Sequence, residues 1–209
     1  MSAKISGPAY RILTERLLLR CWNPTDAEAL RQSLAGNREH LLTFMPWAQD
    51  EPEELQKKIE RLRGFRARFD LGEDFVYGIF DLTGARILGG CGLHRRVGPG
   101  AIEIGYWIDK DHINQGLATE ASTALVKVAF EIESVQRVEI HMDPLNLASA
   151  AVPRKLGFTY EGTLRQRLPS ASGIMRDMMI WTLLAEEYPG SLSSKIHIQA
   201  EDAIGRRIL

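Results

Sequence analysis

The stretches IEIGYWI at residues 102–108 and INQGLATEA at residues 113–121 decide the fold of this chain. The first is typical of a strand, and the second carries a glycine turn and begins an apolar-periodic helix. Such a turn leaves the first N–H groups of the helix pointing outward, where the helix dipole also favours negative charge. The two stretches therefore predict a binding site for a phosphate group.

Length and composition indicate one domain without a bulk charge. The chain has 209 residues, 44% of them hydrophobic, and its 26 basic and 27 acidic residues leave a net charge of −1. Nothing in that charge favours nucleic acid or an anionic membrane. No apolar run approaches the roughly 20 residues of a membrane helix, and no signal segment opens the chain. With Cys21 and Cys91 far apart in apolar, strand-like segments, we expect a cytoplasmic protein that binds neither nucleic acid nor membrane.

Hydrophobic periodicity predicts an α/β domain. The strand, helix and strand within residues 102–142 form a crossover, so we expect the two strands to be parallel and the connection right-handed. Residues 189–209 are typical of an added C-terminal tail, in which residues 201–209 form a short helix or are disordered. Strands are predicted near residues 16–20, 75–81, 86–94, 102–108, 136–142, 158–164 and 174–183, and helices near 27–34, 51–69, 116–132 and 147–156.

Three glycines, Gly89, Gly90 and Gly92, stand inside one predicted strand. Missing side chains there indicate a bulge or a close approach by ligand or backbone, and relief of packing is an equal alternative.

In this order the elements resemble the GCN5-related N-acetyltransferase (GNAT) fold, and more narrowly its RimJ/RimL branch. The resemblance implies a mixed central sheet of about seven strands, with a splayed parallel pair and flanking helices. We take residues 1–188 as the domain. The matching stretches are TERLLLR (14–20), MPW (45–47), the segment from GYW to ATEA (105–121), and the segment from NLAS to GF (146–158).

The resemblance implies an acetyl-CoA-dependent N-acetyltransferase. Its acceptor would be a protein N-terminal α-amine or a small-molecule amine, which attacks directly in a ternary complex. A non-catalytic CoA-binding or partner-interaction module is the alternative, and a homodimer is plausible for this branch. A Rossmann-type dinucleotide binder is disfavoured, because the chain has one crossover and lacks the spaced glycines of that fingerprint.

Cofactor contacts follow from the splayed strands. Buried main-chain groups without partners are costly, and the resemblance implies that the pantetheine arm pairs with those of residues 106–108. Asn146 would bond the arm from the opposite wall, although a plain helix cap is also compatible. The family turn begins with Gln or Arg, where this chain has Ile113. The implied contacts are Tyr106, Trp107, Ile108, Ile113, Asn114, Gln115, Gly116, Leu117, Ala118, Thr119, Asn146 and Lys155.

Acetyl transfer needs a neutral amine, stabilisation of the developing oxyanion and a proton for the leaving thiolate. Glu103 stands where relatives use a carboxylate to take the amine's proton, commonly through water; alternatively it pairs with a cation or faces solvent. Many members have a tyrosine four residues before the Gly-Phe pair, which acts as the general acid for the thiolate; this chain has Pro153 at that position. The branch implies Ser149 as the substitute acid, or else a plain first-turn hydroxyl.

The remaining expectations concern the acceptor and metals. By family analogy the backbone N–H of Ile108 polarises the thioester carbonyl. The aromatic residues Phe44, Trp47 and Tyr77 are candidates to line the acceptor site, and each is also compatible with a place in the core. No His, Cys or carboxylate spacing is typical of a metal site, so we predict no metal.

Overall fold

One mixed sheet of nine strands organises the part of the chain that the computed structural model describes, residues 7–209. Residues 1–6 of the predicted domain lie outside the described residues. The strand order is β7-β8-β6-β5-β4-β3-β2-β1-β9. The strands are β1 (Arg11–Leu13), β2 (Leu17–Cys21), β3 (Asp74–Asp81), β4 (Ile87–His94), β5 (Ala101–Ile108), β6 (Arg137–Met142), β7 (Thr159–Pro169), β8 (Met175–Leu184) and β9 (Gln199–Glu201). The helices are α1 (Ala27–Leu42), α2 (Leu55–Asp70), α3 (Leu117–Glu131), α4 (Leu147–Lys155) and α5 (Leu192–Lys195).

The expected sheet of about seven strands is too small, because β1 and β9 were not anticipated. Each of them has only three residues, too few to show a period of two in sequence. β9 comes from the segment expected as a tail and pairs antiparallel with β1, where Ala200 is completely buried. Residues 201–209 form neither a helix nor a disordered end. The backbone of Glu201 forms an isolated antiparallel β-bridge with that of Arg207.

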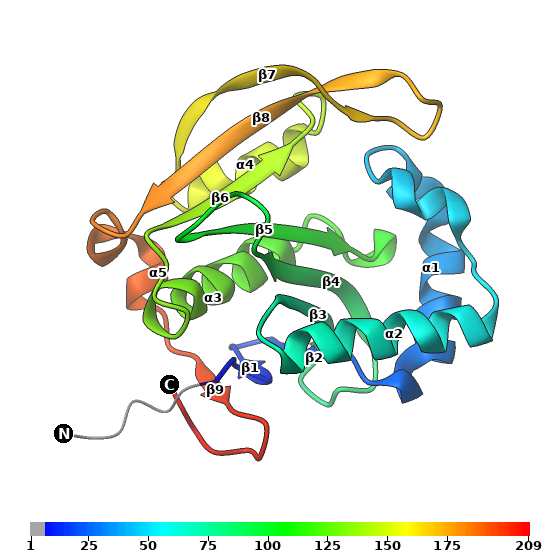
Figure 1. Ribbon diagram of the computed structural model, residues 1–209, viewed down its shortest axis with the longest axis horizontal. Helices are drawn as coiled ribbons and strands as arrows, with labels where there is room; N and C mark the ends of the chain where they lie inside the picture. Colours follow the sequence, from blue (N-terminus) through cyan, green and yellow to red (C-terminus); the bar gives the residue numbers. More distant parts are fainter. Residues whose placement is uncertain (1–6) are drawn as a thin grey trace.

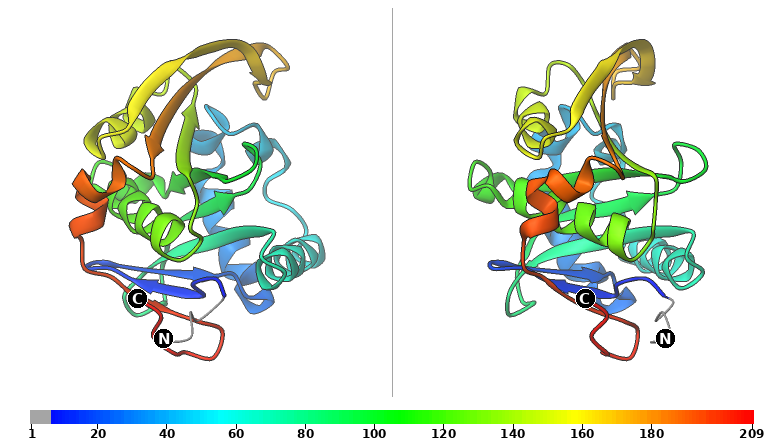
Figure 2. Two further views of the ribbon diagram at one scale, coloured as in Figure 1. Left: turned by 60° about the vertical axis from the view of Figure 1, so that its left-hand side comes forward. Right: turned by 90° about the vertical axis from the view of Figure 1, so that its left-hand side faces the viewer.

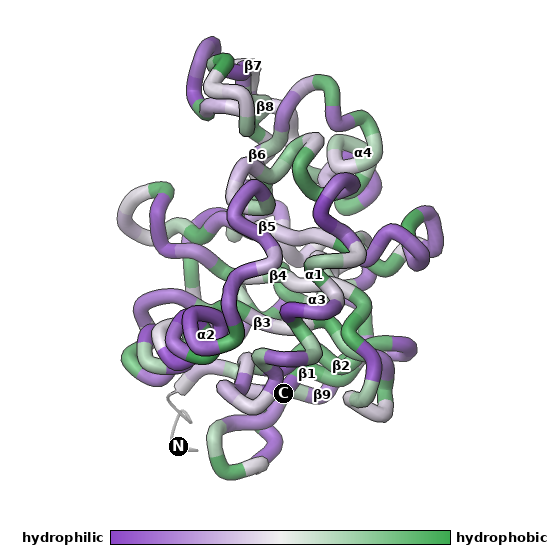
Figure 3. The backbone as a smooth tube through the Cα atoms, turned by 90° about the vertical axis from the view of Figure 1, so that its right-hand side faces the viewer, coloured by the Kyte–Doolittle hydropathy of each residue, from purple (hydrophilic) through white to green (hydrophobic). Residues whose placement is uncertain are grey.

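Helices cover both faces of the sheet. In β2 the side chains alternate: Leu17 and Leu19 enter the hydrophobic core that includes α3, and Leu18 enters the core that includes α1. Figure 3 shows β3 and β4 running between α2 on one side and α3 on the other. No helix in the described part of the chain is long and apolar enough to cross a membrane.

The parallel pair β5 and β6 separates along its length, as the crossover and the family resemblance predicted. Register partners run only from Ala101 and Arg137 to Glu103 and Glu139. Beyond that point β6 continues against β8, and β5 continues against β4 as far as Ile108. Alternate N–H and C=O groups of β5 therefore face a gap on the side of β6.

The β7–β8 hairpin reaches over this gap. Figures 1 and 2 show it arching across one end of the molecule toward the loop that follows α1. Arg176 of β8 donates from Nη1 to the carbonyl O of Thr43 at 3.3 Å and from Nη2 to that of Phe44 at 3.2 Å. The same guanidinium pairs with Asp143 at 3.0 Å. Arg176 thus ties the hairpin to both the loop after α1 and the end of β6.

Candidate active site

A cavity of about 1040 Å³ lies where β4, β5 and β6 meet the β7–β8 hairpin and the loop after α1. This volume suits a small molecule together with the end of a second substrate. The predicted site residues in its lining are Phe44, Trp47, Tyr77, Glu103, Tyr106, Trp107, Asn146 and Ser149. The others, Ile108, Ile113, Asn114, Gln115, Gly116, Leu117, Ala118, Thr119 and Lys155, are not part of this lining.

The predicted phosphate turn has the backbone of an anion site. Gly116 precedes α3 with φ 79°, a left-handed conformation that favours glycine, and no side chain caps the helix. Asn114 also has a positive φ, of 60°. The first-turn N–H groups of α3 have no partners within the helix, so they are available to a phosphate. Because these donors are main-chain groups, Ile113 in place of Gln or Arg leaves them intact.

Arg16 adds a positive charge beside this turn. Its Nη2 pairs with Oε2 of Glu120 in α3 at 2.6 Å, and its Nη1 donates to the carbonyl O of Gln115 at 3.0 Å. Thr14 donates from Oγ1 to Oε1 of Glu120 at 2.6 Å. The stretch at residues 14–20 is one of those that carry the family resemblance. Its position against the predicted phosphate turn could not be predicted from it, because the contacting residues are about a hundred positions apart in the sequence.

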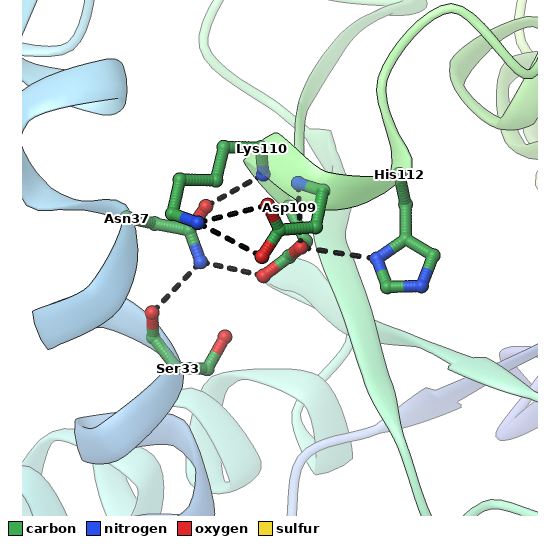
Figure 4. A network of polar contacts seen from close by, with 6 residues as sticks. Ser33, Asn37, Asp109, Lys110 and His112 are labelled. Carbon is green, nitrogen blue, oxygen red and sulfur yellow. Dashed lines mark hydrogen bonds and ion pairs between the residues drawn. The ribbon is translucent and has the colours of Figure 1, made fainter.

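Asn37 of α1 anchors the loop that leads into the turn (Figure 4). Its side chain is buried, accepts from the backbone N–H of Lys110 at 2.7 Å, and donates to Asp109 at 2.6 Å. Burial raises the pKa of Asp109, but hydrogen bonds from Asn37 and His112 outweigh it and hold that pKa below its usual value. The turn is thereby fixed relative to α1 as well as to β5.

Ser149 and Tyr106 form a hydrogen-bonded pair beside the gap. The Tyr106 hydroxyl donates to the carbonyl O of Ser149 at 3.1 Å and lies 3.0 Å from Oγ of Ser149. Within α4, the carbonyl of Ser149 would normally accept from the N–H of residue 153, but Pro153 has none. Tyr106 supplies the missing donor. Burial raises the pKa of Tyr106 to about 12, against a smaller lowering by Ser149, so the hydroxyl keeps its proton at neutral pH.

Asn146 is the cap of α4, since its Oδ1 accepts from the N–H of Ser149 at 3.0 Å. The helix-cap alternative is therefore present in the structure. Capping engages only the oxygen, so the amide nitrogen of this cavity-lining residue keeps its two donor hydrogens. Lys155 lies at the exposed end of the same helix.

Glu103 is paired with a cation, one of the alternatives that the sequence left open. Arg96 donates from Nε to Oε2 at 2.7 Å and from Nη2 to Oε1 at 2.6 Å. Burial raises the pKa of Glu103, but the bonds from Arg96 outweigh it and hold that pKa below the usual range. Glu103 is thus an ionised carboxylate with both oxygens engaged. Arg96 lies in the turn between β4 and β5, so the pairing could have been predicted only with the register of this hairpin in hand.

The aromatic candidates differ in exposure. Trp47 is 42% exposed and Phe44 is partly buried, so both offer surface to an acceptor. Tyr77 is completely buried, and its hydroxyl donates to the carbonyl O of Ala9 at 2.8 Å. Its ring lies edge-on to Phe69, with centroids 5.1 Å apart. Tyr77 therefore supports the wall of the cavity from the core.

The three glycines of β4 make room for neighbouring groups of the same chain. A Cβ at Gly89 would collide with the backbone O of Trp107, and a Cβ at Gly90 would lie 2.5 Å from the Trp107 indole nitrogen. A Cβ at Gly92 would lie 2.6 Å from Nε2 of His94. Gly89 therefore shows the predicted close approach of backbone, whereas Gly90 and Gly92 make room for side chains, which is relief of packing. A bulge in β3 and β4 also lies next to Gly89.

Comparisons with known proteins agree with this geometry. The family model described as the acetyltransferase (GNAT) domain matches residues 16–159. The Escherichia coli ribosomal protein uS5-alanine N-acetyltransferase is 28% identical over 190 residues, which cover 88% of this chain and 95% of that protein. The structure of Mycobacterium smegmatis RimJ in complex with CoA-disulfide is 25% identical, with a TM-score of 0.76, over 85% of this chain and 86% of that one. The RimL ribosomal L7/L12 α-N-protein acetyltransferase with CoA is 24% identical, with a TM-score of 0.74, over 82% and 95%. The chain therefore belongs to the GNAT acetyltransferase family.

Proposed function

We propose that this protein transfers the acetyl group of acetyl-CoA to the α-amine at the N-terminus of a protein. The observation that carries the proposal is the start of α3, where Gly116 adopts a left-handed conformation and no side chain caps the helix, together with the gap between β5 and β6. Acetyl-CoA supplies an activated acetyl group as a thioester. The names of the similar proteins, which include ribosomal-protein N-acetyltransferases and a CoA complex, support both the cofactor and the class of acceptor.

The residues present fit the cofactor. The N–H groups of residues 113–119 would hold its phosphates, with Arg16 adding positive charge from beside the turn. The main-chain groups of residues 104–108 that face the gap would pair with the amides of the pantetheine arm. Asn146 would donate from its free amide nitrogen on the opposite wall.

An α-amine is a suitable acceptor on energetic grounds. Its ordinary pKa is about 7.7–8.0, so deprotonation at about pH 7.4 costs less than about 1 kcal/mol, whereas a lysine amine at about 10.4 costs roughly 4 kcal/mol. Phe44 and Trp47 would contact the residues that follow the amine. Whether Glu103 also takes the proton stays a prediction.

Ser149 is proposed to stabilise the leaving thiolate. Tyr106 has one hydroxyl proton and two acceptors on Ser149, the carbonyl O and Oγ. When that proton points to Oγ, the Ser149 hydroxyl proton is free to turn toward the thiolate. Tyr106 then acts through Ser149 as a positioning residue. A thiol has an ordinary pKa near 8.5, so the thiolate needs only modest help to leave.

The test is release of CoA thiol from acetyl-CoA with three acceptors. These are a short peptide with a free alanine N-terminus, the same peptide with a blocked N-terminus and an internal lysine, and spermidine. We expect thiol release and one added acetyl group with the first alone. Binding of acetyl-CoA without thiol release from any acceptor would favour the non-catalytic module. Activity with spermidine alone would refute the protein acceptor and favour a small amine.

Two further expectations remain predictions. Cys21 and Cys91 are buried free thiols, which is compatible with a reducing, cytoplasmic location. A homodimer is the expectation that the sequence left open for this branch, and sedimentation at several protein concentrations would test it.

A further inference from the structure

Two carboxylates flank one imidazole in a row across three strands of the cavity wall. In the sheet register, Asp74 of β3 is opposite His94 of β4, and His94 is opposite Glu103 of β5. Residues directly opposite each other in adjacent strands present their side chains on the same face. All three residues line the cavity. A titratable row of this kind is a candidate for moving protons.

Asp74 holds the His94 ring in one orientation. Nδ1 of His94 lies 2.7 Å from Oδ1 of Asp74, and the His94 side chain is only 19% exposed. A carboxylate accepts hydrogen bonds, so Nδ1 carries the proton of this bond. In the neutral ring the other nitrogen, Nε2, is then an acceptor with a free lone pair.

The ring lies against a pair of glycines that are opposite each other in β4 and β5, Gly92 and Gly105. A Cβ would lie 2.6 Å from Nε2 of His94 if placed on Gly92, and 3.3 Å from it if placed on Gly105. Two missing side chains thus give the ring its place on the wall. Among the described residues, Nε2 has no hydrogen-bond partner. The acceptor nitrogen is therefore available to a molecule in the cavity.

Glu103 is less suited to accept a proton than His94. Arg96 occupies both of its oxygens, and the pKa of Glu103 is held below its ordinary value. A general base works best when its pKa lies near the operating pH. The ordinary pKa of an imidazole, about 6.5, is closer to neutral than that of a carboxylate, about 4.3.

On the basis of the proposed function, we propose that His94 takes the proton from the acceptor amine and that Asp74 positions it for this step. An N–H bond of the ammonium group breaks and an Nε2–H bond forms, which leaves the amine its lone pair. That pair forms the C–N bond to the acetyl carbon as the C–S bond breaks. The second amine proton ends on the sulfur, and His94 returns its own proton to solvent, so one proton is released per turnover.

Charged groups on several elements surround His94 and its partners. The charged groups that face His94 or its partners are Asp74 of β3, Glu103 of β5, Arg96 after β4, Arg68 of α2 at 4.0 Å from Asp74, and His141 of β6 at 3.8 Å from Glu103. None of the clusters among the described residues could hold a metal ion.

The test compares His94→Gln with wild type, using the free-alanine peptide and acetyl-CoA. We expect kcat/KM to fall about 100-fold or more, the range for loss of a general base. In wild type, kcat/KM should fall as the pH is lowered, and this acid limb of the pH profile should disappear in the variant. Acetyl-CoA binding measured by calorimetry should stay within about twofold of wild type. His197→Gln is the matched control, because His197 is exposed, lies in the segment before β9 and is not part of the cavity lining.

Asp74→Asn separates positioning from catalysis. We expect kcat to fall about tenfold with the peptide KM unchanged, because the Asn amide no longer requires the tautomer with the proton on Nδ1.

Three results would overturn the inference. An unchanged acid limb in His94→Gln would do so, as would loss of that limb in Glu103→Gln alone. A wild-type protein that releases no thiol would instead refute the proposed function, and this inference with it. Thermal unfolding of each variant confirms that it is folded.

Discussion

The hydrogen bond from Tyr106 to the carbonyl O of Ser149 makes a specific prediction about stability. Tyr106→Phe removes that donor, and Pro153 has no N–H to replace it. A buried carbonyl without a donor costs about 1–3 kcal/mol. Since this site is only partly buried, we expect a loss of about 1–2 kcal/mol, or about 2–8 °C in Tm for a chain of this size.

The second half of the prediction uses Pro153→Ala. This change restores an N–H that can reach the Ser149 carbonyl, so Tyr106→Phe should cost about 1 kcal/mol less in that background. Urea unfolding of the four proteins in the double-mutant cycle measures the coupling. Tyr160→Phe is the control, because Tyr160 is 45% exposed and bonds only the exposed Thr163, and we expect less than about 0.5 kcal/mol. Additivity within about 0.5 kcal/mol would refute the reasoning.

Three further predictions concern charge and backbone. Arg96→Leu should destabilise the protein by about 1–2 kcal/mol at neutral pH, discounted because Arg96 is 61% exposed. The lowered pKa of Glu103 means that its stabilisation is present above its unfolded pKa and is lost as pH falls through the folded one, so the variant and wild type should converge in acid; a constant difference would contradict this. Gly116→Ala should weaken acetyl-CoA binding in calorimetry, whereas Gly205→Ala, at φ 78°, imposes similar strain of about 1–2 kcal/mol without that effect; equal affinities would count against the phosphate turn. Lys58→Met should cost about 3–5 kcal/mol in urea unfolding, because it leaves the buried carboxylate of Glu51 without its cation, whereas Glu53 keeps Arg61, and a loss below about 1 kcal/mol would contradict a buried ion pair.

Much of the fold was accessible from local patterns. The glycine turn before α3, the crossover from β5 to β6 and the strands of the meander all follow from periodicity over fewer than about 20 residues. The two strands that escaped prediction, β1 and β9, are three residues each. Their pairing brings together segments from the two ends of the described chain, a contact that no local pattern contains.

The candidate site shows the same division. Tyr106, Asn146 and Ser149 were named from their motifs, and the structure places all three in one cavity lining. Two charged partners at the site were not predicted from the sequence. Arg96 pairs with Glu103, and Arg16 lies beside the glycine turn before α3. An ion pair depends on where two side chains meet after the strands have aligned.

The sequence by itself determined the fold family, the crossover and the glycine turn before α3, because glycine conformation, helix polarity and strand periodicity act between near neighbours in the chain. Only the tertiary structure decided which groups are free to react. Strand register put Asp74 on one side of His94 and Glu103 on the other. Among the described residues, Nε2 of His94 has no hydrogen-bond partner, whereas Arg96 engages both oxygens of Glu103. Register is set by the packing of whole strands, so the proton chemistry of the site is a property of the assembled sheet.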